Sequence, residues 1–161
     1  DSMTLFVDGN HENFDRLYGY PIENWHGGKV HKIRPSVLHL MRGQVFEICN
    51  RSIFTFGGAS SHDISGGILE MDTSNFHREI KRLNRVGIPY RINHWSWWAQ
   101  ELPSDEEYAV ARRSLAVLRV LSSFWGERDL KMILRQGIWR RYDRAQTLRN
   151  GFSGIIMTIR T

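Results

Sequence analysis

The sequence predicts an α/β fold, and three observations lead to this prediction. Short runs rich in β-branched and aromatic residues occupy most of residues 4–56. Two amphipathic helix patterns follow, each with a recognisable start or stop signal. The composition, with 41% hydrophobic and 24% charged residues, is that of a folded globular chain and excludes disorder, collagen and coiled coil. At 161 residues the chain is long enough to bury a single core.

The first half of the chain is expected to be mainly β. Residues 4–7 (TLFV) form a short buried strand, and a short helix starts near Asn13. Residues 18–28 are predicted to be a loop because Gly and Pro interrupt the pattern. Asn50 and Arg51 suit a two-residue hairpin turn. Further strands are expected at residues 29–33, 37–41, 45–49 and 52–56.

Two helices are expected in the second half. The first is capped by Ser74 and stops at Gly87. The second begins at Ser104, where Glu107 completes a capping box, and runs to about Leu121. The side chains expected to be buried are Phe76, Ile80 and Leu83 on the first helix, and Tyr108, Ala111, Leu115 and Leu118 on the second.

The positive charge is concentrated at the C-terminal end. Residues 1–117 contain 13 Lys and Arg against 14 Asp and Glu, a net charge of −1, whereas residues 118–161 contain 9 against 3, a net charge of +6. Such a basic tail indicates an acidic partner such as nucleic acid. We divide the chain into a domain over residues 1–117 and a basic segment over residues 118–161.

Two features bear on the cellular environment. No apolar stretch is long enough for a membrane span and no signal segment opens the chain, so we expect no membrane partner. A single cysteine, Cys49, cannot form an internal disulfide and fits a reducing cytoplasm. Because Met3 is not the first residue and strand-like residues begin at Thr4, we expect coding sequence upstream.

A polar motif, Asp8-Gly9-Asn10-His11-Glu12, follows the first strand. In α/β folds, ligand-binding loops gather at the carboxyl ends of strands. Gly9 permits a tight turn, Asn10 offers an amide oxygen that can bind a metal, and His11 can donate to an anionic oxygen. On residue types alone, a capped strand-to-helix turn is an equally good interpretation.

The wider sequence resembles the calcineurin-like metallophosphoesterases of bacteria and phages. The resemblance covers residues 4–117 and lies in four blocks: LFVDGNHENFDRLYGYP, WHGGKVHKIRPSVLHLMRGQVFEI, FTFGGASSHD and WSWWAQELPSDEEYAVA. It implies a two-sheet α/β/β/α sandwich and two divalent metal ions (Mn, Fe, Zn or Ni), which activate a hydroxide to attack the phosphorus of a phosphoester. It also implies that Asn10 is a metal ligand and that His11 is the catalytic residue facing the phosphate or the leaving oxygen.

Most of the family's metal-site blocks are missing from this chain. The two aspartate-bearing blocks, Asp-x-His and Gly-Asp-x-x-Asp, come earlier in the family order. Gly-His-x-His is absent, and no histidine follows His94. One amide oxygen cannot hold two divalent ions. We therefore expect a partial domain that is inactive as written.

The resemblance ends abruptly near residue 118, and we hypothesise a shifted reading frame beyond it. Joining the third base of each codon to the first two of the next lets NGFSGIIMT encode Trp-x-Phe-Gly-His-x-His-Asp, which contains the missing motif. The intermediate histidine block is not recovered in this way. Sequencing of the source DNA tests the hypothesis.

Two further residues are candidates for substrate binding. Arg42 follows a strand and can face a phosphate, although a solvated strand-end charge is the favoured interpretation. His62 lies in the small-residue loop after Gly57 and Gly58 and can approach the same site. The other histidines lack metal-ligand spacing such as i and i+4 and are expected at the surface or in hydrogen bonds: His26, His31, His39, His77 and His94.

Two surface features have alternative interpretations. The tryptophans of HWSWW can stack on a base, but packing against the protein body is favoured. The face made by Arg78, Lys81, Arg82 and Arg85 is more typical of a solvated helix side than of a binding surface. Three functions remain open: a phosphoester hydrolase fragment, a nucleic-acid-binding module that uses the basic tail and the tryptophans, and an inactive remnant.

Overall fold

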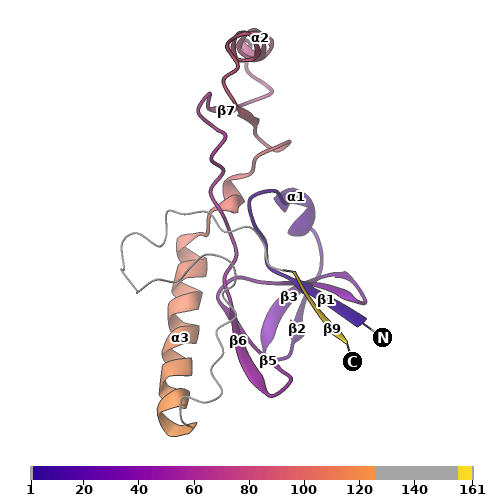
Figure 1. Ribbon diagram of the computed structural model, residues 1–161, viewed down its shortest axis with the longest axis vertical. Helices are drawn as coiled ribbons and strands as arrows, with labels where there is room; N and C mark the ends of the chain where they lie inside the picture. Colours follow the sequence, from indigo (N-terminus) through magenta and orange to yellow (C-terminus); the bar gives the residue numbers. More distant parts are fainter. Residues whose placement is uncertain (1, 126–155, 161) are drawn as a thin grey trace.

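The computed structural model describes residues 2–125 and 156–160, and within them the fold is mixed α/β, as predicted (Figure 1). The strands are β1 (Ser2–Phe6), β2 (Ile22–Trp25), β3 (Gly28–Arg34), β4 (Val37–Leu40), β5 (Gln44–Ile48), β6 (Arg51–Thr55), β7 (Ile68–Leu69), β8 (Arg91–Ile92) and β9 (Ile156–Arg160). The helices are α1 (Phe14–Leu17), α2 (Phe76–Val86), α3 (Asp105–Trp125) and the 3₁₀ turn η1 (Ala99–Glu101).

The central sheet has the strand order β2-β3-β4-β1-β9. β1 is parallel to β4, with Leu5 opposite Leu38, whereas its other neighbour, β9, is antiparallel. The sequence patterns did not predict β9, which lies in the basic C-terminal segment. Residues 126–155 of the proposed frame-shifted region lie outside the described residues.

The body of the protein is layered around this sheet. Successive side chains of a strand point to opposite faces. Leu5 accordingly packs with Phe46 and Ile53 of the β5–β6 hairpin, while Phe6 packs near Phe14 of α1 on the other face. α3 covers the outer face of the hairpin, where Phe54, Ala111 and Leu118 form a third cluster. The order is therefore helix, sheet, hairpin, helix (Figure 1).

The prediction of a loop over residues 18–28 is wrong in its second half. Ile22–Trp25 forms β2, which pairs with β3 through a turn at His26 and Gly27, both at positive φ. β2 is an edge strand and three of its four side chains are exposed. It lacks the alternating apolar pattern that reveals a half-buried strand.

The hairpin between β5 and β6 turns one residue earlier than predicted. Cys49 and Asn50 occupy the turn with φ of 50° and 57°, and Arg51 already pairs with Ile48. A type I′ turn needs positive φ at both central residues. Asn accepts that conformation readily, and the register places Cys49 rather than Arg51 beside it.

The ends of the helices test the capping predictions. Asn75, not Ser74, stands at the N-cap of α2 and makes no side-chain cap hydrogen bond, so that prediction is wrong. The predicted stop at Gly87 is confirmed, since it adopts φ 66°. The capping box of α3 is also confirmed: the Ser104 N–H donates to Glu107 Oε2 at 2.8 Å, and the Glu107 N–H donates to Ser104 Oγ at 3.2 Å.

Burial on the helices follows the prediction in part, and Tyr108 of α3 is only half-buried. Leu83 of α2 is buried and Phe76 and Ile80 are half-buried, while Ala111 and Leu118 of α3 are buried. Leu115 is exposed, because the hairpin covers a narrower stripe of α3 than its apolar pattern indicates. None of the described helices is long and apolar enough to cross a membrane.

Candidate functional site

The turn after β1 places Asn10 and His11 at the carboxyl end of the central sheet. Glu12 closes this turn, because its Oε2 accepts from the N–H of Gly9 at 3.0 Å and of His11 at 3.1 Å. Asn13 then caps α1 by accepting from the N–H of Arg16 at 2.9 Å. The backbone is thus the capped strand-to-helix turn that the residue types allow. The imidazole of His11 is exposed and Asn10 is half-buried.

The orientation of the Asn10 amide follows from a chain of hydrogen bonds. Ser61 Oγ donates its single proton to Glu101 Oε2 at 2.7 Å, and the Ser61 N–H donates to Glu101 Oε1 at 2.8 Å. Ser61 Oγ can therefore only accept from Asn10, whose Nδ2 lies 3.3 Å away. Among the described residues, Asn10 Oδ1 has no hydrogen-bond donor. The buried carboxylate of Glu101 thus leaves the amide oxygen of Asn10 available to a ligand.

Two glycines allow the loop that carries Ser61 to approach the turn. The Gly58 N–H donates to the carbonyl of Asp8 at 2.9 Å, and the Ala59 N–H donates to the carbonyl of Glu101 at 3.0 Å. A Cβ at Gly57 would overlap the carboxylate of Asp8. Gly58 has φ 95°, which strongly favours glycine. Segments distant in sequence are in this way fixed around the Asn10 turn.

Beneath the turn lies a buried ion-pair network around Asp8. Its Oδ2 accepts from Arg42 Nε at 2.8 Å and also from Arg42 Nη2, and its Oδ1 accepts from His39 Nε2 at 3.0 Å. Arg42 Nη1 donates to Glu107 at 3.0 Å, and Nη2 donates to the carbonyl of Gln100 at 2.7 Å. Burial raises the pKa of Asp8, but the hydrogen bonds from His39 and Arg42 outweigh it and hold this pKa below its ordinary value.

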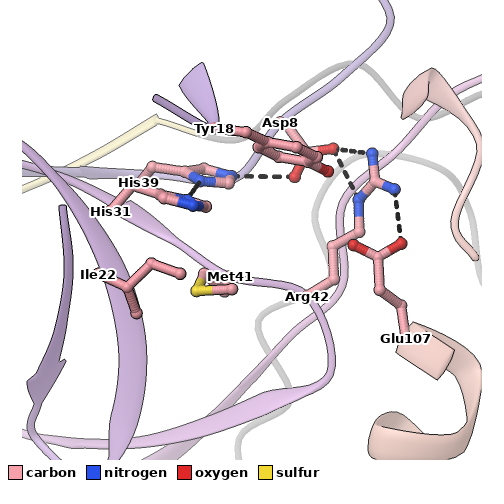
Figure 2. A pocket seen from close by; sticks show the side chains of 8 residues that line it. All are labelled: Asp8, Tyr18, Ile22, His31, His39, Met41, Arg42 and Glu107. Carbon is pink, nitrogen blue, oxygen red and sulfur yellow. Dashed lines mark hydrogen bonds and ion pairs between the residues drawn. The ribbon is translucent and has the colours of Figure 1, made fainter. Parts of the chain in front are cut away.

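Two histidines extend this network across the sheet (Figure 2). His31 and His39 face each other on β3 and β4, with their Nδ1 atoms 3.0 Å apart. His39 Nε2 donates to Asp8 Oδ1, and the two Nδ1 atoms share one proton in the hydrogen bond between the rings. Burial and the neighbouring His39 lower the pKa of His31 to about 4. His31 is therefore neutral near pH 7, and both rings are part of the core.

A cavity of about 230 Å³ lies beside these rings. The ring of Tyr18 stacks on His31, with centroids 5.4 Å apart, and burial raises the pKa of Tyr18 to about 12. Ile22 and Met41 supply apolar lining (Figure 2). The sequence patterns did not identify this buried group of ionisable side chains, which consists of Asp8, His31 and His39. The available signal was Asp8, a charged residue directly after a buried strand.

The two candidate substrate-binding residues lie in different surroundings. Arg42 is buried, so the interpretation as a solvated charge is wrong. Its donors are engaged by Asp8, Glu107 and Gln100, and phosphate binding by Arg42 would require that network to open. His62 is exposed and adjacent to Ser61, the residue that contacts Asn10. A role of His62 in substrate binding stays a prediction.

The tryptophan cluster divides between core and surface. Trp98 is buried with Phe14, as the packing interpretation predicts, and its Nε1 donates to Asp15 at 2.7 Å. Asp15 also lies 2.8 Å from Nδ1 of His94. Trp95 is 70% exposed, so packing does not account for it.

The described residues do not fit a two-metal centre. They contain no group of three or more His, Cys, Asp or Glu side chains placed to hold an ion. Asn10 and His11 together offer one amide oxygen and one imidazole. Divalent ions in pairs need several anionic or imidazole donors.

No protein-family model, curated protein or solved structure matches this chain. The mixed α/β class therefore rests on the structure itself. The family and its activity rest on the resemblance of residues 4–117 and remain proposals.

Proposed function

We propose that residues 1–117 are part of a calcineurin-like phosphoesterase domain, in which Asn10 and His11 form one corner of a site that cleaves a phosphomonoester or phosphodiester. The observation that carries the proposal is the orientation of Asn10. Glu101 and Ser61 orient its amide so that, among the described residues, Oδ1 has no hydrogen-bond donor, and the next residue, His11, has an exposed imidazole.

The layering of the body supports the proposal. The order of α1, central sheet, β5–β6 hairpin and α3 is compatible with part of an α/β/β/α sandwich. Asn10 and His11 lie at the carboxyl edge of parallel strands β1 and β4, where such folds hold their ligands. In this proposal the remaining metal ligands come from polypeptide outside the described residues.

The role proposed for His11 follows from its position. An exposed imidazole on a turn fixed by Glu12 can donate a hydrogen bond to a phosphate oxygen or a proton to a leaving oxygen. The described residues hold no complete metal site, so we expect the chain as given to hydrolyse little above buffer.

The test restores the upstream coding sequence and the alternative frame, then measures hydrolysis of bis-p-nitrophenyl phosphate with Mn²⁺. We expect turnover in the restored protein and a loss of about a hundredfold for His11→Ala. His77→Ala is the matched control, because His77 is equally exposed but lies on α2. Full turnover by His11→Ala contradicts the role given to His11, and a restored protein without metal-dependent turnover contradicts the function.

The alternative function as a nucleic-acid-binding module was based on the basic tail, whose residues 126–155 lie outside the described part of the chain. A protein ending at Val117 should lose the part of the salt-dependent DNA binding that the tail carries.

A further inference from the structure

Helix α2 carries a cationic face. A rotation of about 100° per residue brings Arg78, Lys81, Arg82 and Arg85 to one side of the helix, with His77 at its border. All of these side chains are exposed to solvent. Figure 1 shows α2 at one end of the molecule, away from the central sheet and α1.

The opposite, apolar face of α2 is already occupied. Leu83 is buried, and a Cβ added at Gly66 would lie 2.9 Å from its Cδ2 atom. Phe76 and Ile80 are half-buried on the same side. The helix therefore cannot insert this face into a lipid bilayer as an amphipathic membrane helix does. A partner that binds α2 would therefore contact its charged side chains.

The charge on α2 stands out against the rest of the domain. The helix contains four Lys and Arg against one Glu, whereas the remainder of residues 1–117 contains 9 Lys and Arg against 13 Asp and Glu, a net charge of −4. Arg82 pairs with Glu79 at 2.8 Å. Within the described part of the chain, Arg78, Lys81 and Arg85 form no ion pair. The cationic face is therefore a local feature.

We propose that this face of α2 binds the phosphate backbone of a nucleic acid. Arg78 and Arg85 are seven residues apart, which corresponds to about 10 Å along the helix axis. One nucleic-acid strand carries a phosphate every 3.4 Å or so of its axis, so about three phosphates face this length of helix. The guanidinium groups of Arg78 and Arg85 can each bind phosphate oxygens in a bidentate manner. The regular spacing of phosphates along one strand allows both side chains to bind the same strand. Contacts of this kind carry no sequence preference.

The proposal is independent of the Asn10 site and is tested by binding alone. The probe is a fluorescein-labelled oligothymidylate of about twenty nucleotides, measured by fluorescence anisotropy with the full chain. The variant is Arg78→Gln/Lys81→Gln/Arg85→Gln. The control, Lys29→Gln/Arg51→Gln/Arg112→Gln, removes the same charge from exposed positions on β3, β6 and α3 and keeps the same basic tail. Circular dichroism checks that both variants fold.

Counterion release sets the expected effect. At 0.1 M salt each phosphate contact contributes about fivefold in affinity, so three contacts contribute about a hundredfold. We expect the α2 variant to lose about this factor and its salt slope to fall by about 2, with a loss of less than about threefold in the control. Equal losses in both variants, or no loss in the α2 variant, would overturn the proposal. Equally tight, α2-dependent binding of polyglutamate or phosphatidylserine vesicles would overturn the assignment to nucleic acid.

Discussion

The buried pair of Arg42 with Asp8 gives the sharpest prediction for stability. Arg42→Met keeps much of the side-chain volume but removes every donor to the Asp8 carboxylate except His39 Nε2. It also removes the donors to Glu107 and to the Gln100 carbonyl. The perturbation leaves a buried carboxylate, 1% exposed as a residue, with His39 as its single side-chain partner.

The loss of unfolding free energy depends on which of the separated partners of Arg42 can be hydrated by water. Removing one partner of a buried ion pair costs about 3–5 kcal/mol because the other charge stays buried. Glu107 is partly exposed and regains water, so its separation from Arg42 adds less than about 1 kcal/mol. We expect Arg42→Met to lose about 4 kcal/mol of unfolding free energy. Arg42→Lys keeps the charge but not the two-pronged contact and should lose about half as much.

The assay is urea unfolding at pH 7, followed by tryptophan fluorescence and circular dichroism. Asp8→Asn completes a double-mutant cycle, and the double variant should lose much less than the two single variants together. A loss below about 1 kcal/mol for Arg42→Met, or strict additivity in the cycle, would refute the view that the pair is buried and coupled. Arg42→Lys stays measurable if the methionine variant does not fold.

Three other predictions concern different parts of the fold. The pKa of His31 is lowered to about 4, so between pH 6.5 and pH 4 the unfolded chain binds a proton that the folded protein does not. The free energy of unfolding should therefore fall as the pH falls through this range. His31→Gln should flatten this part of the stability curve, and an unchanged slope would contradict the burial of the neutral ring. A Cβ at Gly28 would lie 2.6 Å from Phe46, so Gly28→Ala should lower the free energy of unfolding in urea by about 1–3 kcal/mol. Gly19→Ala is the control and should change it little, because the nearest atom to a Cβ at Gly19 would be 3.4 Å away. Ser104→Ala removes the cap of α3 and should lower stability by about 1 kcal/mol, and an unaltered urea midpoint would show that the capping box has no energetic role.

The secondary structure was predictable where local chemistry decides it. Apolar β-branched runs revealed β1 and the strands β3 to β6, and the pair Ser104 and Glu107 revealed the start of α3. Local sequence patterns did not predict the elements whose structure depends on a neighbouring strand. β2 is a polar edge strand that exists because β3 lies beside it, and the turn at Cys49 and Asn50 is set by the register of the hairpin.

The site was predictable only at its surface. Asn10 and His11 were found because they belong to a contiguous motif. His31 and His39 lack the i and i+4 spacing of metal ligands on a helix. They lie directly opposite each other on the paired strands β3 and β4. Arg42 and Asp8 are 34 residues apart and are brought together by the parallel pairing of β1 with β4. No local pattern carries that contact.

The proposed function requires Asn10 Oδ1 to be a metal ligand in the restored protein. Its most direct test is a crystal structure of the restored protein soaked in Mn²⁺, with anomalous scattering collected at the manganese edge. We predict an anomalous peak about 2.2 Å from Asn10 Oδ1, with Nδ2 still donating to Ser61. A manganese peak bound elsewhere, with Asn10 Oδ1 pointing away from it, would contradict the account.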